Sequence, residues 1–364
     1  MRLQRVAIDH IRNLHDVSID LSAHLNILFG ENASGKTSFL ESLHMLAYAK
    51  SFRSHHFRHI VNHGAHFLRV TGLITETGGD RAVPLGIEYR QGRLKMRADG
   101  RNVKKTSELA QHLPIIVIHQ ECQRLLTGGP KLRRKFLDWG VFHVEQRFLP
   151  AWRRYVRALK QRNSVLQAGK GRAAVSVWDQ ELKENAVAIH AYRRAYCDVL
   201  LPVWQQCTRQ LLGNGEVLSL SYQAGWDIDQ DYSAILAASY EQDARRGFTH
   251  HGPHRADLAI RVAGVSAHEH LSRGQQKLLI CAMLIAQALV YRQHSQKPCI
   301  FLIDDLKAEL DDEHVRRVMV LLKDLDAQII MTATEKGTLE PYCPEGHKTF
   351  HVERGQVTDV TEVV

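Results

Sequence analysis

A phosphate-binding loop is the feature that most constrains how this chain folds. Residues 30–37 read G-E-N-A-S-G-K-T, which is the spacing G-x-x-x-x-G-K-T, between the apolar run 25–29 and a helix-periodic run at 35–49. In a strand–loop–helix context, the backbone N–H groups of such a loop surround a β-phosphate at a helix N-terminus. Lys36 then neutralises phosphate oxygens, and the Thr37 hydroxyl joins a Mg²⁺ shell. A chance glycine-rich turn is the alternative, and the flanking strand and helix disfavour it. The predicted nucleotide-binding residues are Gly30, Glu31, Asn32, Ala33, Ser34, Gly35, Lys36, Thr37 and Ser38.

Two carboxylates follow the most apolar run of the chain. Residues 299–303 read C-I-F-L-I, and Asp304 and Asp305 come directly after them. A buried central strand delivers its last side chains to the edge of the sheet where ligands bind. Asp304 is therefore expected to orient Mg²⁺, and Asp305 to hold or deprotonate an attacking water. The alternative is a strand followed by a solvated acidic turn.

A short motif opens the helix that precedes this strand. Residues 271–275 read L-S-R-G-Q, and here the sequence resembles the ABC-type ATPases, whose L-S-G-G-Q element contacts the γ-phosphate held by the opposite subunit. The resemblance implies that Ser272, Gly274 and Gln275 act in this way in a dimer. The simpler interpretation, which is compatible with the first, is that Ser272 is a helix N-cap. Residues 328–334 resemble the switch strand of these enzymes, with Thr334 where a transporter ATPase has His. Gln120 is assigned to the glutamine loop.

The spacing of these motifs indicates an α/β head interrupted by a helical arm. Lys36 and Ser272 are 236 positions apart (272 − 36), which is more than transporter ATPases use. The excess contains two long helix-periodic runs, 131–167 and 177–212, which are expected to pair as an antiparallel hairpin with kinks or breaks at Pro150 and Pro202. The expected fold is an ABC-type ATPase head (P-loop NTPase) that resembles an SMC head with a truncated coiled coil. The expected domains are an N-terminal lobe at 1–125, the arm at 126–215 and a C-terminal lobe at 216–364.

Positive charge is concentrated in the first part of this arm. The chain has a formal net charge of +9, whereas 13 Lys and Arg lie between Arg124 and Arg172 and only Asp138 and Glu145 oppose them. A basic stretch of this kind is typical of contact with nucleic-acid phosphates without base readout. A solvated helix face is the alternative. The residues predicted to contact DNA are Arg133, Arg134, Arg153, Arg157 and Lys160.

The remaining composition predicts a cytoplasmic protein without a membrane segment. The six cysteines form no C-x-x-C pair, so a zinc site is not expected and their use fits a reducing compartment. The first residues alternate like a strand and contain no signal-peptide core. No run approaches the roughly 20 apolar residues that a membrane helix needs.

Motifs along the whole chain resemble those of the RecF family of bacterial recombination mediators. They are I-R-N at 11–13, the phosphate loop, K-S-F-R at 50–53, G-G-P-K at 128–131, F-L-D-W at 136–139, G-P-H-R at 252–255, L-S-R-G-Q and the two carboxylates. The resemblance adds Arg12 to the nucleotide-binding residues. Ala33 stands where the family usually has Gly, which restricts the loop but keeps Gly30 and Gly35.

The resemblance implies an ATP- and Mg²⁺-dependent homodimer that binds gapped or junction DNA. It also implies RecO and RecR as partners and a role in helping RecA replace single-strand-binding protein. Asp305, where many ABC ATPases have Glu, suggests slow, DNA-stimulated hydrolysis. Two other hypotheses stay open at this point: an ATPase subunit of a transporter or nuclease complex, and a static DNA clip in which nucleotide only fills a site.

Overall fold

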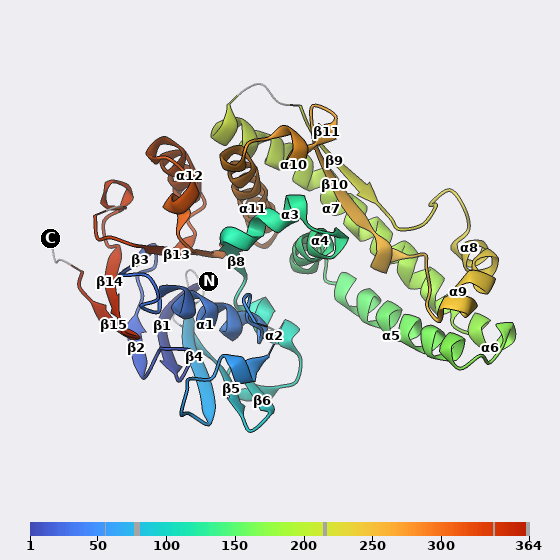
Figure 1. The fold of residues 1–364 in the computed structure, drawn as a ribbon, viewed down its shortest axis with the longest axis horizontal. Helices are drawn as coiled ribbons and strands as arrows, with labels where there is room; N and C mark the ends of the chain where they lie inside the picture. Colours follow the sequence, from blue (N-terminus) through green and yellow to red (C-terminus); the bar gives the residue numbers. More distant parts are fainter. Residues whose placement is uncertain (55, 76–80, 214–216, 338, 362–364) are drawn as a thin grey trace. The chain divides into compact units, whose positions relative to one another are not determined.

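The chain forms two compact units. The structure, a computed structural model, describes residues 1–361 except 55, 76–80, 214–216 and 338. Unit 1 contains Met1–Cys122 and Tyr291–Val364, and unit 2 contains Gln123–Val290. Unit 1 thus combines the two ends of the chain, and unit 2 is the insertion between them (Figure 1).

These units differ from the three segments expected from the sequence. Residues after 215 were expected to form a lobe with the C-terminus, but those up to Val290 cluster with the helices that precede them. The reason is local pairing: strand β10 (Asp257–Val262) pairs with β9 (Leu218–Gln223), and these strands contact α4 (Pro130–Val144) and α7 (Asp179–Leu212) respectively. The division at 125 and 215 stays a prediction.

Unit 1 holds two six-stranded sheets. The order β2-β1-β4-β5-β6-β7 is antiparallel throughout, and the order β15-β14-β3-β13-β12-β8 is parallel except at the β15–β14 pair. The strands of the first sheet are β1 (Arg2–Asp9), β2 (Val17–Asp20), β4 (Phe67–Thr75), β5 (Ala82–Arg90), β6 (Arg93–Ala98) and β7 (Arg101–Val103). Those of the second are β3 (Leu25–Phe29), β8 (Ile115–Ile118), β12 (Ile300–Ile303), β13 (Gln328–Ala333), β14 (Lys348–Glu353) and β15 (Gln356–Asp359). In Figure 1 the blue β3 and the red β13 and β14 therefore belong to one sheet, although most of the chain separates them.

Helix α1 (Lys36–Tyr48) forms the centre of unit 1. Phe39, Leu40, Leu43 and Leu46 are fully buried, and α1 contacts β4 and β5 of one sheet and β8 and β13 of the other. Such burial on several sides fits a helix that is apolar around most of its circumference. The other helices of unit 1 are α2 (Thr106–His112), α12 (Asp312–Asp324), η1 (Phe57–His59), η4 (Leu306–Glu309) and η5 (Glu340–Tyr342), with η2 (Gln120–Gln123) at its boundary.

Unit 2 contains the predicted helical hairpin, formed by α5 (Phe148–Gln167) and α7. Arg162 Nε lies 2.9 Å from Asp179, and Arg154 Nε lies 3.0 Å from Asn185 Oδ1, so that the two helices run antiparallel. The run expected at 131–167 is two helices, because α4 ends before Glu145.

The two prolines of the hairpin take different positions in their helices. Pro150 lies in the first turn of α5, where its missing N–H would be unpaired in any case. Pro202 lies inside α7, which is 34 residues long and does not end there, so a kink at Pro202 stays a prediction. The other elements of unit 2 are α3 (Arg124–Thr127), α6 (Arg172–Ser176), α8 (Tyr232–Ala238), α9 (Tyr240–Arg246), η3 (Pro253–Arg255), β11 (Val265–Ser266), α10 (Ala267–His270) and most of α11 (Arg273–Ser295).

Helix α11 corrects one expectation about apolar segments. The sequence was expected to hold no run long and apolar enough for a membrane helix, but α11 is long enough and has an 18-residue window that is apolar enough. Of that window, 83% is buried inside the protein, as in the core helix of a folded domain.

Candidate nucleotide-binding site

The phosphate loop is held in a fixed shape by residues outside the motif. Gly30 has φ 153°, and a Cβ there would lie 2.2 Å from the carbonyl oxygen of Val352 in β14, so that only glycine fits. Asn13 Nδ2 donates hydrogen bonds to the carbonyls of Ala33 and Ser34, at 3.1 and 2.9 Å. The role of Asn13 was missed from the sequence, although it lies within a motif of the family. The loop is thus braced from β14 and from the turn after β1.

Ala33 adopts a conformation that is costly for any residue with a side chain. Its φ is 63°, in the left-handed region, which costs an L-residue about 1 kcal/mol or more relative to glycine. The expected restriction of the loop by alanine is therefore backbone strain at Ala33, while the loop keeps its shape.

Lys36 lies beside the two carboxylates that follow β12. Its Nζ donates to the carbonyls of Gly30 and Glu31, at 2.6 and 2.8 Å. Burial lowers the pKa of Lys36, and the nearby charges of Asp305 and Asp304 oppose this shift. A lysine whose donors rest on loop carbonyls is available to exchange them for phosphate oxygens.

A line of hydrogen bonds crosses three parallel strands at their carboxyl ends. Thr37 Oγ1 donates to Asp304, with both carboxylate oxygens at 3.0 Å, and Thr332 Oγ1 donates to Asp304 Oδ1 at 2.8 Å. Thr332 also accepts from the backbone N–H of Asp305 at 2.9 Å, and Asp305 has φ 47°. The predicted metal-binding pair, Thr37 and Asp304, is thus brought together from residues far apart in the chain.

Thr332, and not Thr334, makes this contact from β13. Thr332 is 2% exposed, whereas Thr334 follows the end of β13 and is exposed. Thr334, which the resemblance placed at the position of the transporter histidine, stays a prediction. The missed signal was a threonine inside an otherwise apolar strand.

The end of β8 brings His119 to the same edge of the sheet. The backbone N–H of Asp304 donates to the carbonyl of Ile118 at 2.8 Å. Because Ile303 and Ile118 pair in the sheet, Asp304 and His119, which follow them, are neighbours. The rings of His119 and Phe52 are in tilted contact, with their centroids 4.9 Å apart, and burial lowers the pKa of His119, opposed by the charges of Glu121 and Asp304. Gln120, the residue predicted for the glutamine loop, is exposed at the start of η2. Its assignment stays a prediction, and His119 is the better buried of the two.

The site fits a bound phosphate and a divalent cation. The Ser34 hydroxyl is buried in the loop, and among the described residues it has no hydrogen-bond partner. The first N–H groups of an α-helix have no partner within the helix, so the start of α1, which includes the buried Ser38, can donate to a phosphate. The oxygen atoms of Thr37 and Asp304 are ligands that Mg²⁺ prefers.

The signature motif lies in unit 2 and has a defined local structure. The backbone N–H of Ser272 donates to Gln275 Oε1 at 3.0 Å, and the N–H of Gln275 donates to Ser272 Oγ at 3.3 Å. This reciprocal pair is a capping box at the start of α11, so the N-cap interpretation is confirmed. Ser272 and Gln275 are exposed and Gly274 is partly exposed, which leaves the helix N-terminus open to a phosphate.

The predicted DNA-contacting residues divide into exposed and internal ones. Arg153, Arg157 and Lys160 are exposed on α5, and Arg153 and Arg157 line a hollow of about 470 Å³ together with Pro150 and Arg154. Arg157 Nη2 lies 3.4 Å from Glu181, and because exposed ion pairs of this kind are weak, these side chains can still meet a polyanion.

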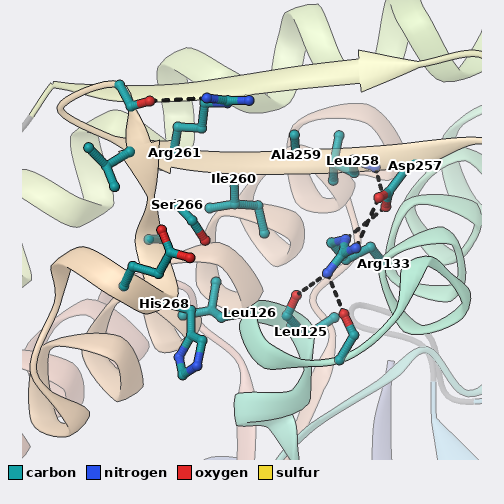
Figure 2. A pocket seen from close by; sticks show the side chains of 15 residues that line it. Leu125, Leu126, Arg133, Asp257, Leu258, Ala259, Ile260, Arg261, Ser266 and His268 are labelled. Atoms are coloured by element: carbon teal, nitrogen blue, oxygen red, sulfur yellow. Dashed lines mark hydrogen bonds and ion pairs between the residues drawn. The ribbon is translucent and has the colours of Figure 1, made fainter.

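Arg133 and Arg134 are engaged inside unit 2. Arg133 donates to both carboxylate oxygens of Asp257, at 2.7 and 2.9 Å, and to the carbonyl of Gly128 at 2.6 Å. Figure 2 shows this guanidinium below β10, in the wall of a hollow of about 630 Å³. Arg134 donates to the carbonyl of Ala256 at 2.7 Å, and burial lowers its pKa. The charge count therefore overstated the basic surface, because these two arginines have internal partners.

Comparisons with known proteins agree with this arrangement. The sequence matches the RecF/RecN/SMC N terminal domain over residues 2–358. It is 43% identical to the DNA replication and repair protein RecF of Pseudomonas paraeruginosa, over 100% of this chain and 99% of the relative. It is 44% identical to that of Azotobacter vinelandii, over 98% of each chain.

Solved structures share the fold. One described as the recombination mediator protein RecF-ATP in the RecFOR pathway has a TM-score of 0.88 at 24% identity, covering 99% of this chain and 98% of its own. An Smc head bound to the C-winged helix domain of ScpA has a TM-score of 0.62 at 16% identity, covering 100% and 98%. The expected ABC/SMC-type head with a helical arm is confirmed. With a family match across nearly its whole length, a phosphate loop and a signature motif in their expected structural contexts, this chain belongs to the RecF family of DNA replication and repair proteins.

Proposed function

We propose that this protein is an ATP-dependent, DNA-binding recombination mediator whose two copies join when each binds ATP. The observation that carries the proposal is the hydrogen-bonded line Thr37–Asp304–Thr332 beside Lys36, in a member of the RecF family. The solved relative with bound ATP supports ATP as the nucleotide. The alternative of an ATPase subunit of a transporter or nuclease predicts turnover that does not respond to DNA.

The residues of unit 1 divide the chemistry among them. Lys36 exchanges its two carbonyl contacts for phosphate oxygens, and the loop amides and the Ser34 hydroxyl take the β-phosphate. Thr37 and Asp304 hold Mg²⁺, which supplies positive charge beside those oxygens. Asp305 orients and deprotonates the attacking water, and its short carboxylate makes hydrolysis slow.

The second half of each site comes from the other copy. Ser272, Gly274 and Gln275 present a capped helix N-terminus, which attracts the γ-phosphate bound by the partner copy. ATP that binds fully only in the dimer shifts the monomer–dimer equilibrium by mass action. Loss of the γ-phosphate on hydrolysis then releases the two copies.

Arg153, Arg157 and Lys160 contact the DNA backbone without reading bases. The family suggests gapped or junction DNA as the substrate and RecO and RecR as partners in the cytoplasm, with RecA loading as the outcome. The pathway named for the solved relative supports this assignment.

Light scattering and DNA titration with ATP, with ADP and without nucleotide test the proposal. We expect dimer mass and tight DNA binding only with ATP. Ser272→Arg is expected to bind ATP as a monomer, since the larger side chain blocks close approach, and mixing it with Lys36→Ala chains restores one composite site and part of the hydrolysis.

Ser176→Arg is the matched control, because Ser176 is an exposed serine on α6. A Ser272→Arg chain that dimerises with ATP as the wild type does would refute the composite site. Normal ATP affinity in Lys36→Ala would refute the phosphate-loop assignment.

A further inference from the structure

Glu41 is a buried carboxylate at the centre of unit 1. It lies in α1, and its side chain is 0% exposed. It accepts hydrogen bonds from Arg12 Nε at 3.1 Å, from Arg12 Nη2 at 3.0 Å and from the hydroxyl of Ser51, and Arg53 Nη1 lies 3.6 Å from it. A buried charge of this kind requires such partners, because an unpaired carboxylate in the protein interior is strongly destabilising.

On one side, Glu41 holds the turn that braces the phosphate loop. Arg12 has φ 55°, its backbone N–H donates to the carbonyl of Ile60 at 2.7 Å, and its Nη1 donates to the carbonyl of His59 at 2.8 Å. The next residue, Asn13, donates to the carbonyls of Ala33 and Ser34 in the loop. The position of the loop wall therefore depends on the Arg12–Glu41 pair.

On the other side, Glu41 holds the start of the basic segment 50–59, of which the structure describes residues 50–54 and 56–59. The Ser51 hydroxyl accepts from the backbone N–H groups of Arg53 and Ser54, both at 2.8 Å, while it donates to Glu41. The sequence contains no Asp or Glu between positions 42 and 75. The exposed basic groups described in this segment are Lys50, Arg53, His56, Arg58 and His59.

We propose that Glu41 is a positioning residue that serves two ligands at once: it holds Arg12 for the nucleotide and the segment 50–59 for nucleic-acid phosphates. This rests on the proposed function and adds a second DNA-contacting surface, in unit 1, to the arginines of α5. Because both arginines share one carboxylate, affinity for ATP and affinity for DNA depend on the same side chain. Pre-organised cations bind more tightly than mobile ones, since less side-chain entropy is lost on binding.

Double-mutant cycles test this proposal. Glu41→Gln is expected to weaken binding of a fluorescent ATP analogue about tenfold and binding of duplex DNA severalfold, through loss of pre-organisation. In the Glu41→Gln background, Arg12→Gln should add little further loss of ATP affinity. In the same background, Arg53→Gln should add little further loss of DNA affinity. Asp9→Asn is the control, because it breaks the Arg69 Nε–Asp9 pair of the same unit, at 2.7 Å, and should leave both affinities unchanged.

Additive losses in both cycles, or unchanged affinities in Glu41→Gln, would overturn the proposal. If Glu41→Gln does not fold, Ser51→Ala replaces it, because this change removes one donor and keeps the carboxylate. Ser51→Ala should weaken DNA binding more than ATP binding. Equal or absent losses count against the proposal.

Hydrogen exchange at the amides of Arg53 and Ser54 separates this proposal from the proposed function. Faster exchange of these two amides in Glu41→Gln supports the positioning role even if the wild type binds no ATP. Unchanged exchange in Glu41→Gln refutes it.

Discussion

Replacing Thr332 by valine tests whether the hydrogen-bonded line at the strand ends controls hydrolysis. Valine has nearly the shape of threonine and carries a methyl group in place of the hydroxyl. Thr332 is 2% exposed, so this hydroxyl is buried. Two bonds are lost: the donation to Asp304 Oδ1 at 2.8 Å and the acceptance from the Asp305 N–H at 2.9 Å. Among the described residues, the Asp304 carboxylate then keeps the hydrogen bond from Thr37, and the Asp305 amide loses its bond to Thr332.

The expected cost follows from the kind of bond. A hydrogen bond to a charged group contributes about 1.5–3 kcal/mol and a neutral one about 0.5–1.5 kcal/mol, and the extra buried methyl of valine offsets roughly 0.8 kcal/mol. We therefore expect Thr332→Val to lower the free energy of unfolding by about 2 kcal/mol. Turnover should fall by roughly 10- to 100-fold, because a carboxylate free to move no longer fixes the cation, while ATP affinity changes little.

Urea denaturation and steady-state ATP turnover at saturating Mg²⁺ measure these quantities. Thr334→Val is the matched control, since Thr334 is exposed beyond the end of β13, and we expect a change within about 0.5 kcal/mol and normal turnover. Wild-type turnover in Thr332→Val would show that the line is not part of the mechanism. A loss of turnover confined to Thr334→Val would instead support Thr334 as the functional residue of the switch strand.

Three further predictions concern the loop, the carboxylates and a buried histidine. Asp304→Asn and Asp305→Asn should keep ATP-dependent dimerisation and lose hydrolysis, and wild-type turnover in either variant would show that its assigned role is wrong. Ala33→Gly should raise the free energy of unfolding by about 0.5–1 kcal/mol, because the φ of 63° suits glycine, and a lower denaturation midpoint would contradict this. Burial lowers the pKa of His254 from 6.5 to about 4, so the unfolded chain takes up a proton that the folded chain excludes. The free energy of unfolding should therefore fall as pH drops from 6.5 to 4, by about 1.4 kcal/mol per pH unit from this residue, and His254→Gln should flatten that slope; an unchanged slope would contradict the burial argument.

Local pattern was sufficient for the elements that carry the nucleotide motifs. The apolar runs at 25–29 and 299–303 contain the strands Leu25–Phe29 and Ile300–Ile303, and the helix expected at 35–49 is Lys36–Tyr48. These segments are buried central strands or a core helix. Because buried elements need apolar side chains, their pattern is visible in the sequence.

The strands that were missed lack such a pattern. β6 and β15 are edge or near-edge strands with many polar and exposed residues, so their extended form depends on the neighbouring strand. β14 was also missed, although it pairs with β3 and its Val352 carbonyl defines the space at Gly30. The break between α4 and α5 at Glu145 was likewise not visible in a continuous helical period.

By itself, the sequence determined the phosphate loop, the paired carboxylates and the family, because each depends on residue types at short, fixed spacing. Only the tertiary structure decided which polar groups support them, since Thr332 and Glu41 act through partners distant in the chain. The same holds for charge. Composition counts Arg133 and Arg153 equally, but in the folded protein Arg133 is mostly covered and bonded to Asp257, whereas Arg153 is exposed. Packing decides which side chains are covered, and no linear pattern records that.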